Sequence, residues 1–90
     1  MEGKFINVRE FEGVRNQFII TTTKGRYFQS YETLIAFIPN DNEKKIQLDR
    51  KMWNCSVTTS KYRNRFLGEN LKETRKKLAV GDYVYRNLNK

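Results

Sequence analysis

The residue pattern of this 90-residue chain changes character once, near Thr58, and that change restricts the folds open to it. Before this point β-branched and aromatic residues dominate, as in Phe18-Ile19-Ile20-Thr21-Thr22-Thr23. After it, good helix formers recur with helical spacing. The single proline, Pro39, stands in Pro39-Asn40-Asp41-Asn42-Glu43, the strongest turn signal of the chain. A block of strands followed by helices predicts an α+β domain rather than alternating strand–helix units.

We expect four strands before the helices and one after them. The predicted strands are Lys4–Phe11, Val14–Thr23, Arg26–Ile38, Lys45–Leu48 and Asp82–Tyr85, with Lys24-Gly25 as a hairpin turn. The predicted order is β-β-β-β-α-α-β, a small antiparallel sheet of four to five strands with two short helices on one face. Without a linker or an internal repeat, residues 1–90 read as a single domain.

Capping residues mark the two predicted helices. The first, short helix is expected to begin at Thr58, Thr59 or Ser60 and to end at Gly68 in the left-handed conformation. Its residues Tyr62, Phe66 and Leu67 share one apolar stripe. The second helix is expected to begin at Asn70, where Glu73 completes a capping-box pattern, and to stop at Gly81.

Aromatic residues must supply much of the core, because a chain of this size buries only roughly 60–65% of its surface on folding. Each aromatic side chain buries about 150–250 Å². If the chain folds alone, most of the larger ones are therefore expected in the core: Phe5, Phe11, Phe18, Phe28, Phe37, Trp53 and Phe66. A homodimer would relax this requirement, so monomer and homodimer both remain open.

The composition argues against catalysis and against a cofactor. The chain contains no histidine, the commonest general base and metal ligand, and one cysteine, Cys55, which excludes an intramolecular disulfide. Its carboxylates fall in predicted turns or near helix ends, in no pair suited to acid–base work and with no metal-ligand spacing. We expect no enzyme, no catalytic residue, no metal and no cofactor. Without a signal peptide or a stretch of about 20 apolar residues, we expect a cytoplasmic protein with no membrane partner.

Positive charge is concentrated in the second half of the chain. Residues 1–43 carry a net charge of −1, whereas residues 44–90 carry +9, which accounts for the total of +8. Segregation of this kind is typical of a surface with one sign of potential, and a positive surface attracts polyanions or an acidic protein.

Both predicted helices carry cationic stripes away from their apolar stripes. Lys61 and Arg65 are four residues apart, as are Lys72 and Lys76. Hydroxyls and unpaired amides at a helix N-terminus, together with nearby cations, suit an anion. The candidate binding residues are Thr59, Ser60, Lys61, Arg63, Asn64 and Arg65 on the first helix and Lys72, Arg75 and Lys76 on the second. A solvated helix face is the alternative interpretation.

Two other binding modes remain open at the level of sequence. A short helix, a glycine turn and a second helix are typical of a helix-turn-helix motif, although the first helix is short and no third helix is predicted. Tyrosines at Tyr27 and Tyr31, and at Tyr83 and Tyr85, share strand faces and suit either base stacking or the margin of the core.

Several segments together resemble an uncharacterised small domain found in proteins of bacteriophages and mobile elements. They are Ser30–Phe37, Gln47–Asp49, Trp53–Glu69, Glu73–Lys77 and Gly81–Asn89, and Thr58-Thr59-Ser60-Lys61-Tyr62-Arg63-Asn64 is the most specific part. The resemblance implies a phage or mobile-element setting and no particular mechanism.

The sequence therefore favours a small, non-catalytic, phage-type protein that binds nucleic acid, DNA rather than RNA, through a basic helical face in the cytoplasm of the host. In this hypothesis the cations contact phosphates and Asn64 reaches a base edge. The alternative is a phage-encoded inhibitor or adaptor whose basic face docks on an acidic host protein.

Overall fold

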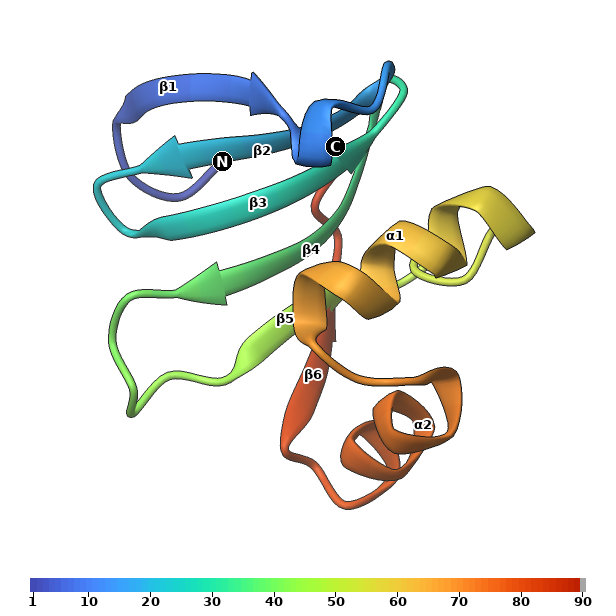
Figure 1. The fold of residues 1–90 in the computed structure, drawn as a ribbon. Helices are drawn as coiled ribbons and strands as arrows, with labels where there is room; N and C mark the ends of the chain where they lie inside the picture. The colour runs from blue at the N-terminus through green and yellow to red at the C-terminus, as the bar shows by residue number, and fades with distance from the viewer. Residues whose placement is uncertain (90) are drawn as a thin grey trace.

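The computed structural model, which describes residues 1–89, contains one mixed sheet and two helices (Figure 1). The strands are β1 (Phe5–Glu10), β2 (Gln17–Thr22), β3 (Gly25–Ser30), β4 (Thr33–Pro39), β5 (Ile46–Asp49) and β6 (Tyr83–Arg86). The helices are α1 (Val57–Leu67) and α2 (Leu71–Ala79), and a short 3-10 turn, η1 (Phe11–Gly13), follows β1. Residue 90, the last of the predicted 1–90 domain, lies outside the described residues.

The six strands are ordered along the sheet as they are along the chain, so β1 and β6 form its two edges. Neighbouring strands from β1 to β5 pair antiparallel, whereas β5 and β6 pair parallel. A parallel pair needs a long crossover, and here α1 and α2 together form it. The helices are thus held between two adjacent strands of one sheet.

The α+β class and the broad order of strands and helices are confirmed, but the sheet has six strands rather than four to five. The predicted third strand, Arg26–Ile38, is in fact two strands joined by a turn at Tyr31-Glu32. Ser30 pairs with Thr33 across this turn, and Tyr31 adopts a left-handed φ of 56°. The sheet is also mixed rather than purely antiparallel, because β6 pairs parallel to β5.

The helix ends follow the expected chemistry, with one shift. The prediction that Asn70 and Glu73 form a capping box at α2 is confirmed, and Gly68 ends α1 with φ 72°. Helix α1 starts earlier than predicted, because the Ser56 side chain, rather than a residue from Thr58 to Ser60, accepts the hydrogen bond from the Thr59 amide. Neither helix in the described part of the chain is long and apolar enough to cross a membrane.

Both helices pack on the same face of the sheet. An aromatic cluster joins Phe11 of η1, Phe28 of β3 and Phe66 of α1, with ring centroids 5.7–6.4 Å apart. Leu78 of α2 packs against the same buried cluster, which also contains Tyr83. The two contacts of Phe11 are edge-to-face and the Phe28–Phe66 contact is tilted, and together with the burial of apolar area they hold α1 over β3.

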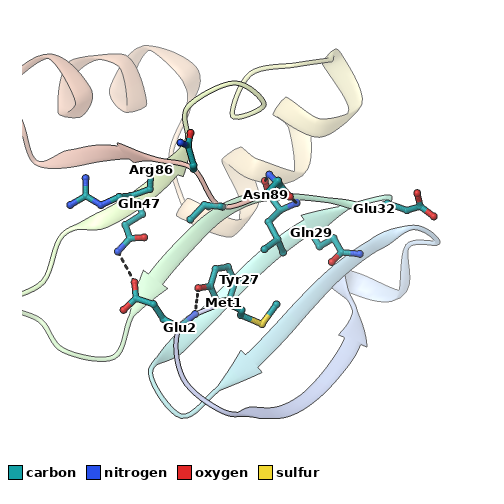
Figure 2. Close-up of a pocket in the computed structure, with 11 residues that line it drawn as sticks. Met1, Glu2, Tyr27, Gln29, Glu32, Gln47, Arg86 and Asn89 are labelled. Carbon is teal, nitrogen blue, oxygen red and sulfur yellow. Dashed lines mark hydrogen bonds between the residues drawn. The ribbon is translucent and has the colours of Figure 1, made fainter.

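The opposite face is covered by the two ends of the chain. Ile20, Tyr27 and Phe37 are buried there, and Leu88 packs against them. The backbone amide of Glu2 donates to the Tyr27 hydroxyl, and Gln47 donates to the Glu2 carboxylate, as Figure 2 shows. A cavity of about 800 Å³ lies between these segments. Its charged side chains are Glu2, Glu32 and Arg86, so it has no excess of positive charge to attract an anion.

The predicted aromatic core is partly correct. Phe28 and Phe37 are buried, and Phe11, Trp53 and Phe66 are half-buried against the core. Phe5 is not, since 62% of it is exposed.

A close backbone approach makes Gly25 intolerant of a side chain. A Cβ atom there would meet the Ile38 carbonyl oxygen and, at 2.8 Å, the Phe37 ring. We expect Gly25→Ala to lower the free energy of unfolding by about 1–3 kcal/mol, measured by urea denaturation. The exposed neighbour variant Lys24→Ala should stay within about 0.5 kcal/mol of wild type. Equal stability of the two variants would contradict the close packing of β3 on β4.

Candidate functional site

The nine candidate residues divide into a buried pair and an outward-facing set. Thr59 is 3% exposed and Arg63 is fully buried. The outward-facing set comprises Ser60, Lys61, Asn64 and Arg65 on α1 and Lys72, Arg75 and Lys76 on α2, of which Ser60 and Asn64 are partly covered. We call these seven residues the helical basic surface.

The guanidinium of Arg63 is held inside the protein by four neutral oxygens. Nη1 donates to the Trp53 carbonyl oxygen (2.7 Å), to Asn54 Oδ1 (3.0 Å) and to Ser60 Oγ (3.3 Å), and Nη2 donates to Asn64 Oδ1 (2.9 Å). The group also lies over the Trp53 ring, 5.1 Å from its centroid. Full burial of an arginine is rare, and here hydrogen bonds and ring contact offset part of its desolvation.

The environment of Arg63 shifts the pKa of its guanidinium. Burial lowers the pKa of the Arg63 guanidinium, the charge of Glu69 raises it, and the charge of Arg75 lowers it further. The net effect is a pKa below the usual value.

Arg63 and Thr59 therefore connect parts of the fold in this conformation rather than facing solvent. Arg63 ties the segment before α1 to the helix, and the Thr59 hydroxyl lies 3.0 Å from the Ser30 hydroxyl of β3. A phosphate could not reach the Arg63 guanidinium without breaking this network. We accordingly leave Thr59 and Arg63 out of the proposed contact surface.

A groove of about 770 Å³ runs along the outer side of α1. It brings together four of the predicted residues, Ser60, Lys61, Asn64 and Arg65. The sequence reasoning missed the rest of its lining, which is Asn54, Ser56, Val57 and Leu71. The spacing of Val57, Lys61 and Asn64 at i, i+4 and i+7 is a signal that could have identified this helix face.

Buried Arg63 orients the side chains of two asparagines that line the groove, Asn54 and Asn64. An arginine side chain only donates hydrogen bonds, so the atoms that face it must be oxygens. The amide oxygens of Asn54 and Asn64 are therefore turned inward toward Arg63. Their amide nitrogens do not bind Arg63, and both residues also line the groove. The exposed lining of the groove is mostly apolar, and its charged members are Lys61 and Arg65.

Aromatic rings support the cations of α1. The Lys61 ammonium and the Arg65 guanidinium each lie 5.5 Å from the centroid of the Tyr62 ring, and Arg26 of β3 lies 5.9 Å from that of Phe66. Cation–ring contact restrains long side chains that would otherwise be mobile in solvent. Arg65 also forms an ion pair with Glu12 at 2.6 Å.

Three of the four cations of α2 have no acidic partner among residues 1–89. Within residues 1–89 the structure contains two ion pairs, Arg65–Glu12 and Lys77–Glu69. The exposed side chains of Lys72, Arg75 and Lys76 belong to neither, and Lys61 does not either. Four unneutralised cations on adjacent helices produce a field that attracts polyanions.

Glu69, in the turn between the helices, fixes the position of α2. Its carboxylate, 3% exposed, accepts hydrogen bonds from Lys77 (2.6 Å), from Tyr83 of β6 (2.7 Å) and from Thr74. Burial raises the pKa of Glu69, but these hydrogen bonds outweigh it and hold the pKa below its usual value. Burial and the bond to Glu69 raise the pKa of Tyr83 to about 12.

The structure argues against two alternative binding modes, base stacking on the tyrosines and a helix-turn-helix motif. Tyr27 and Tyr83 are buried, so neither pair of tyrosines offers two free rings to unpaired bases, although Tyr31 is 56% exposed. The described residues contain two α-helices, with Tyr62 and Phe66 of α1 packed against the sheet core, so there is no third helix to support a helix-turn-helix. Within the same residues no group of three or more His, Cys, Asp or Glu side chains could hold a metal ion.

Comparison with known proteins identifies the family but not the activity. The model of a family of unknown function, DUF8033, matches residues 5–81, and the chain belongs to this family. No curated protein and no solved structure matches the chain significantly.

Replacement of the buried arginine tests its internal role. Arg63→Ala removes all four hydrogen bonds. The partly buried acceptors Trp53 O and Asn64 Oδ1 lose this donor, whereas Asn54 Oδ1 still accepts from Ser60. We expect the free energy of unfolding to fall by about 3 kcal/mol or more, measured by urea denaturation. Arg65→Ala, which removes an exposed ion pair two residues away, should cost at most about 1 kcal/mol. Similar losses in the two variants would rule out the internal role of Arg63.

The Glu69 network predicts a pH dependence of stability. Because its folded pKa lies below the unfolded value of about 4.3, Glu69 stabilises the protein above that pH, and the stabilisation is lost as pH falls through the folded pKa. Glu69→Gln should therefore lower stability at pH 7 by about 1–3 kcal/mol, with a smaller deficit near pH 3. Thermal unfolding from pH 3 to 7 measures this, with the exposed Glu43→Gln as a control that should parallel wild type. A deficit independent of pH would contradict the network.

Proposed function

We propose that this member of the DUF8033 family is a small, non-catalytic protein that binds nucleic acid through the helical basic surface. The supporting observation is the placement of four exposed cations that have no acidic partner within residues 1–89, Lys61, Lys72, Arg75 and Lys76, beside a groove lined by Asn54 and Asn64. Phosphate contacts from Lys and Arg supply most of the sequence-independent affinity for nucleic acid.

The groove along α1 adds a second kind of contact. Lys61 and Arg65 would bind phosphates at its margin, while Asn64 would donate to a phosphate oxygen or to an acceptor on a base edge. Asn64 is restrained, because its amide oxygen accepts from Arg63 at 2.9 Å. A donor fixed in this way can discriminate between ligands better than a mobile one.

The biological setting belongs to the same proposal. The resemblance carried by Thr58–Asn64 and its flanking segments supports a phage or mobile-element protein that acts in the host cytoplasm. We propose DNA rather than RNA as the ligand, because hydrogen-bond donors and cations on a helix face suit the acceptor-rich major groove of duplex DNA.

One observation favours a second candidate function, docking on an acidic host protein as an inhibitor or adaptor. Val57, 89% exposed, and Leu71 form apolar walls of the groove, which suit a protein side chain better than a phosphate. Val57→Ser should then weaken capture of a host protein from nuclease-treated lysate and leave affinity for DNA unchanged. A loss of DNA affinity alone would exclude this second function.

The salt dependence of binding tests the proposed contacts. If the five cations of the helical basic surface each neutralise one phosphate, log affinity should fall with log salt concentration with a slope of about −4 to −5 on duplex DNA. Lys72→Ala/Lys76→Ala should weaken binding and flatten the slope by about 1.8. Fluorescence anisotropy with labelled DNA, from about 50 to about 300 mM salt, measures both quantities.

The matched control removes the same charge elsewhere. Arg15→Ala/Lys24→Ala changes two exposed cations outside the helices and should alter the slope far less. If both double variants change the slope equally, only net charge matters and the proposed surface is wrong. If wild type fails to bind at low salt, nucleic acid is not the ligand.

A further inference from the structure

One cation of the helical basic surface is already neutralised by the protein itself. Arg65 donates from Nη1 to Glu12 Oε1 at 2.6 Å, whereas the other four cations of that surface have no acidic partner among residues 1–89. Glu12 belongs to η1, and Arg65 lines the groove along α1. The carboxylate of Glu12 therefore occupies the place at Arg65 that an anionic ligand of the groove would need.

An aromatic anchor holds the turn that carries Glu12. The ring centroid of Phe11 lies 6.3 Å from that of Tyr62 and 6.4 Å from that of Phe66, both on α1. Glu12 has a left-handed φ of 54°, which is uncommon for a residue other than glycine. Backbone strain of this kind persists where surrounding contacts fix it. The turn thus keeps a carboxylate beside Arg65 in a conformation that costs free energy.

The contact between Glu12 and Arg65 is of a kind that exchanges readily. The two side chains are 42% and 47% exposed, and ion pairs so open to water contribute little to stability. The contact uses Nη1 of Arg65, whereas a guanidinium can bind a phosphate through two parallel N–H groups. The Tyr62 ring, 5.5 Å from the guanidinium, would keep Arg65 in place after Glu12 leaves.

The competition favours ligands with more than one anionic group. A phosphate and the Glu12 carboxylate on the same guanidinium would repel each other, so one must replace the other. A single anion gains little, because it exchanges one ion pair for another. A ligand with a second anionic group also gains Lys61, which lines the same groove and has no acidic partner among the described residues.

We propose that Glu12 is a specificity-determining residue of the groove. It occupies Arg65 in the free protein and gives way to a ligand that presents adjacent phosphates, rather than to an isolated anion. This inference rests on the proposed function, because it takes the ligand of α1 to be a chain of phosphates. It adds that the protein itself excludes weaker anions from the site.

A double-mutant cycle with DNA tests the competition. Glu12→Gln should raise the affinity for duplex DNA about two- to fivefold, the range that the strength of an exposed ion pair gives. In an Arg65→Ala background the same change should leave the affinity nearly unchanged, since no cation remains for Glu12 to occupy. Fluorescence anisotropy measures all four affinities. A gain of equal size with and without Arg65 would mean that only net charge matters, and would overturn the proposal.

The matched control removes one negative charge close by. Glu10→Gln changes an exposed residue of β1, two positions from Glu12. It should raise the affinity for DNA clearly less than Glu12→Gln does. An equal rise in the two variants would again point to net charge and overturn the proposal.

Inorganic tripolyphosphate separates this inference from the proposed function, because it carries adjacent phosphates but no base or sugar. NMR can follow the Arg65 Nε–H signal and the Glu12 carboxyl carbon in the labelled protein. We expect tripolyphosphate to shift both signals together in wild type, and inorganic phosphate at the same concentration to shift the Arg65 signal far more in Glu12→Gln than in wild type.

The outcomes distinguish the two failures. Joint shifts with tripolyphosphate, in a protein that does not bind DNA, would support the exchange at Arg65 and reject nucleic acid as the ligand. DNA binding without any shift of the Glu12 carboxyl signal would overturn the role of Glu12 alone. An Arg65 signal that responds to neither phosphate compound in wild type or in Glu12→Gln would also overturn it.

Discussion

The burial of one guanidinium organises the helical side of this protein. Arg63 joins the Trp53–Asn54 segment, which leads from the sheet, to two residues of α1, Ser60 and Asn64. Its hydrogen bonds are all donated to neutral oxygens, so the positive charge is desolvated without a carboxylate partner. An arrangement of this cost persists only where surrounding packing stabilises it, and the Trp53 ring, 5.1 Å from the guanidinium, contributes to that packing.

The same interaction shapes the chemistry of the surface above it. Arg63 draws the amide oxygens of Asn54 and Asn64 inward, and both residues also line the groove. Glu69, in the turn before α2, fixes the second helix: it forms an ion pair with Lys77 of α2 and accepts a hydrogen bond from Tyr83 of β6. Lys72, Arg75 and Lys76 are exposed and have no acidic partner within residues 1–89. The charge asymmetry of the chain thus becomes one positive helical surface with a neutral strand at the far edge of the sheet.

The sequence predicts the parts of the fold that depend on local chemistry. Asn70 and Glu73 signal the start of α2, Gly68 the end of α1, and the Pro39 turn the end of a strand, because caps and turns act over a few residues. The turn at Tyr31-Glu32 escapes prediction, since it contains no glycine, proline or asparagine and its left-handed residue is a tyrosine. The parallel pairing of β6 depends on tertiary packing, which local sequence patterns do not predict.

The candidate site is only partly predictable for a related reason. Cationic spacing at i and i+4 places Lys61 with Arg65 and Lys72 with Lys76, and these four residues are exposed as expected. The same spacing rule cannot distinguish Arg63 from its neighbours, because its burial depends on Trp53 and Asn54, which come from outside the helix. For Phe5 the prediction of burial is wrong, because the side chain is exposed. Aromatic content predicts burial, but it does not show whether the same chain or a second copy would cover the side chain.

Binding of nucleic acid to the surface that Arg63 and Glu69 organise can be tested by a two-dimensional NMR titration of the isotope-labelled protein with a short, unlabelled DNA duplex at low salt. We expect the largest amide shift changes along α1 and α2, at Ser60, Lys61, Asn64, Arg65, Lys72, Arg75 and Lys76. Largest changes in β1 to β3, or around the cavity lined by Glu2 and Glu32, or no changes at all, would contradict it.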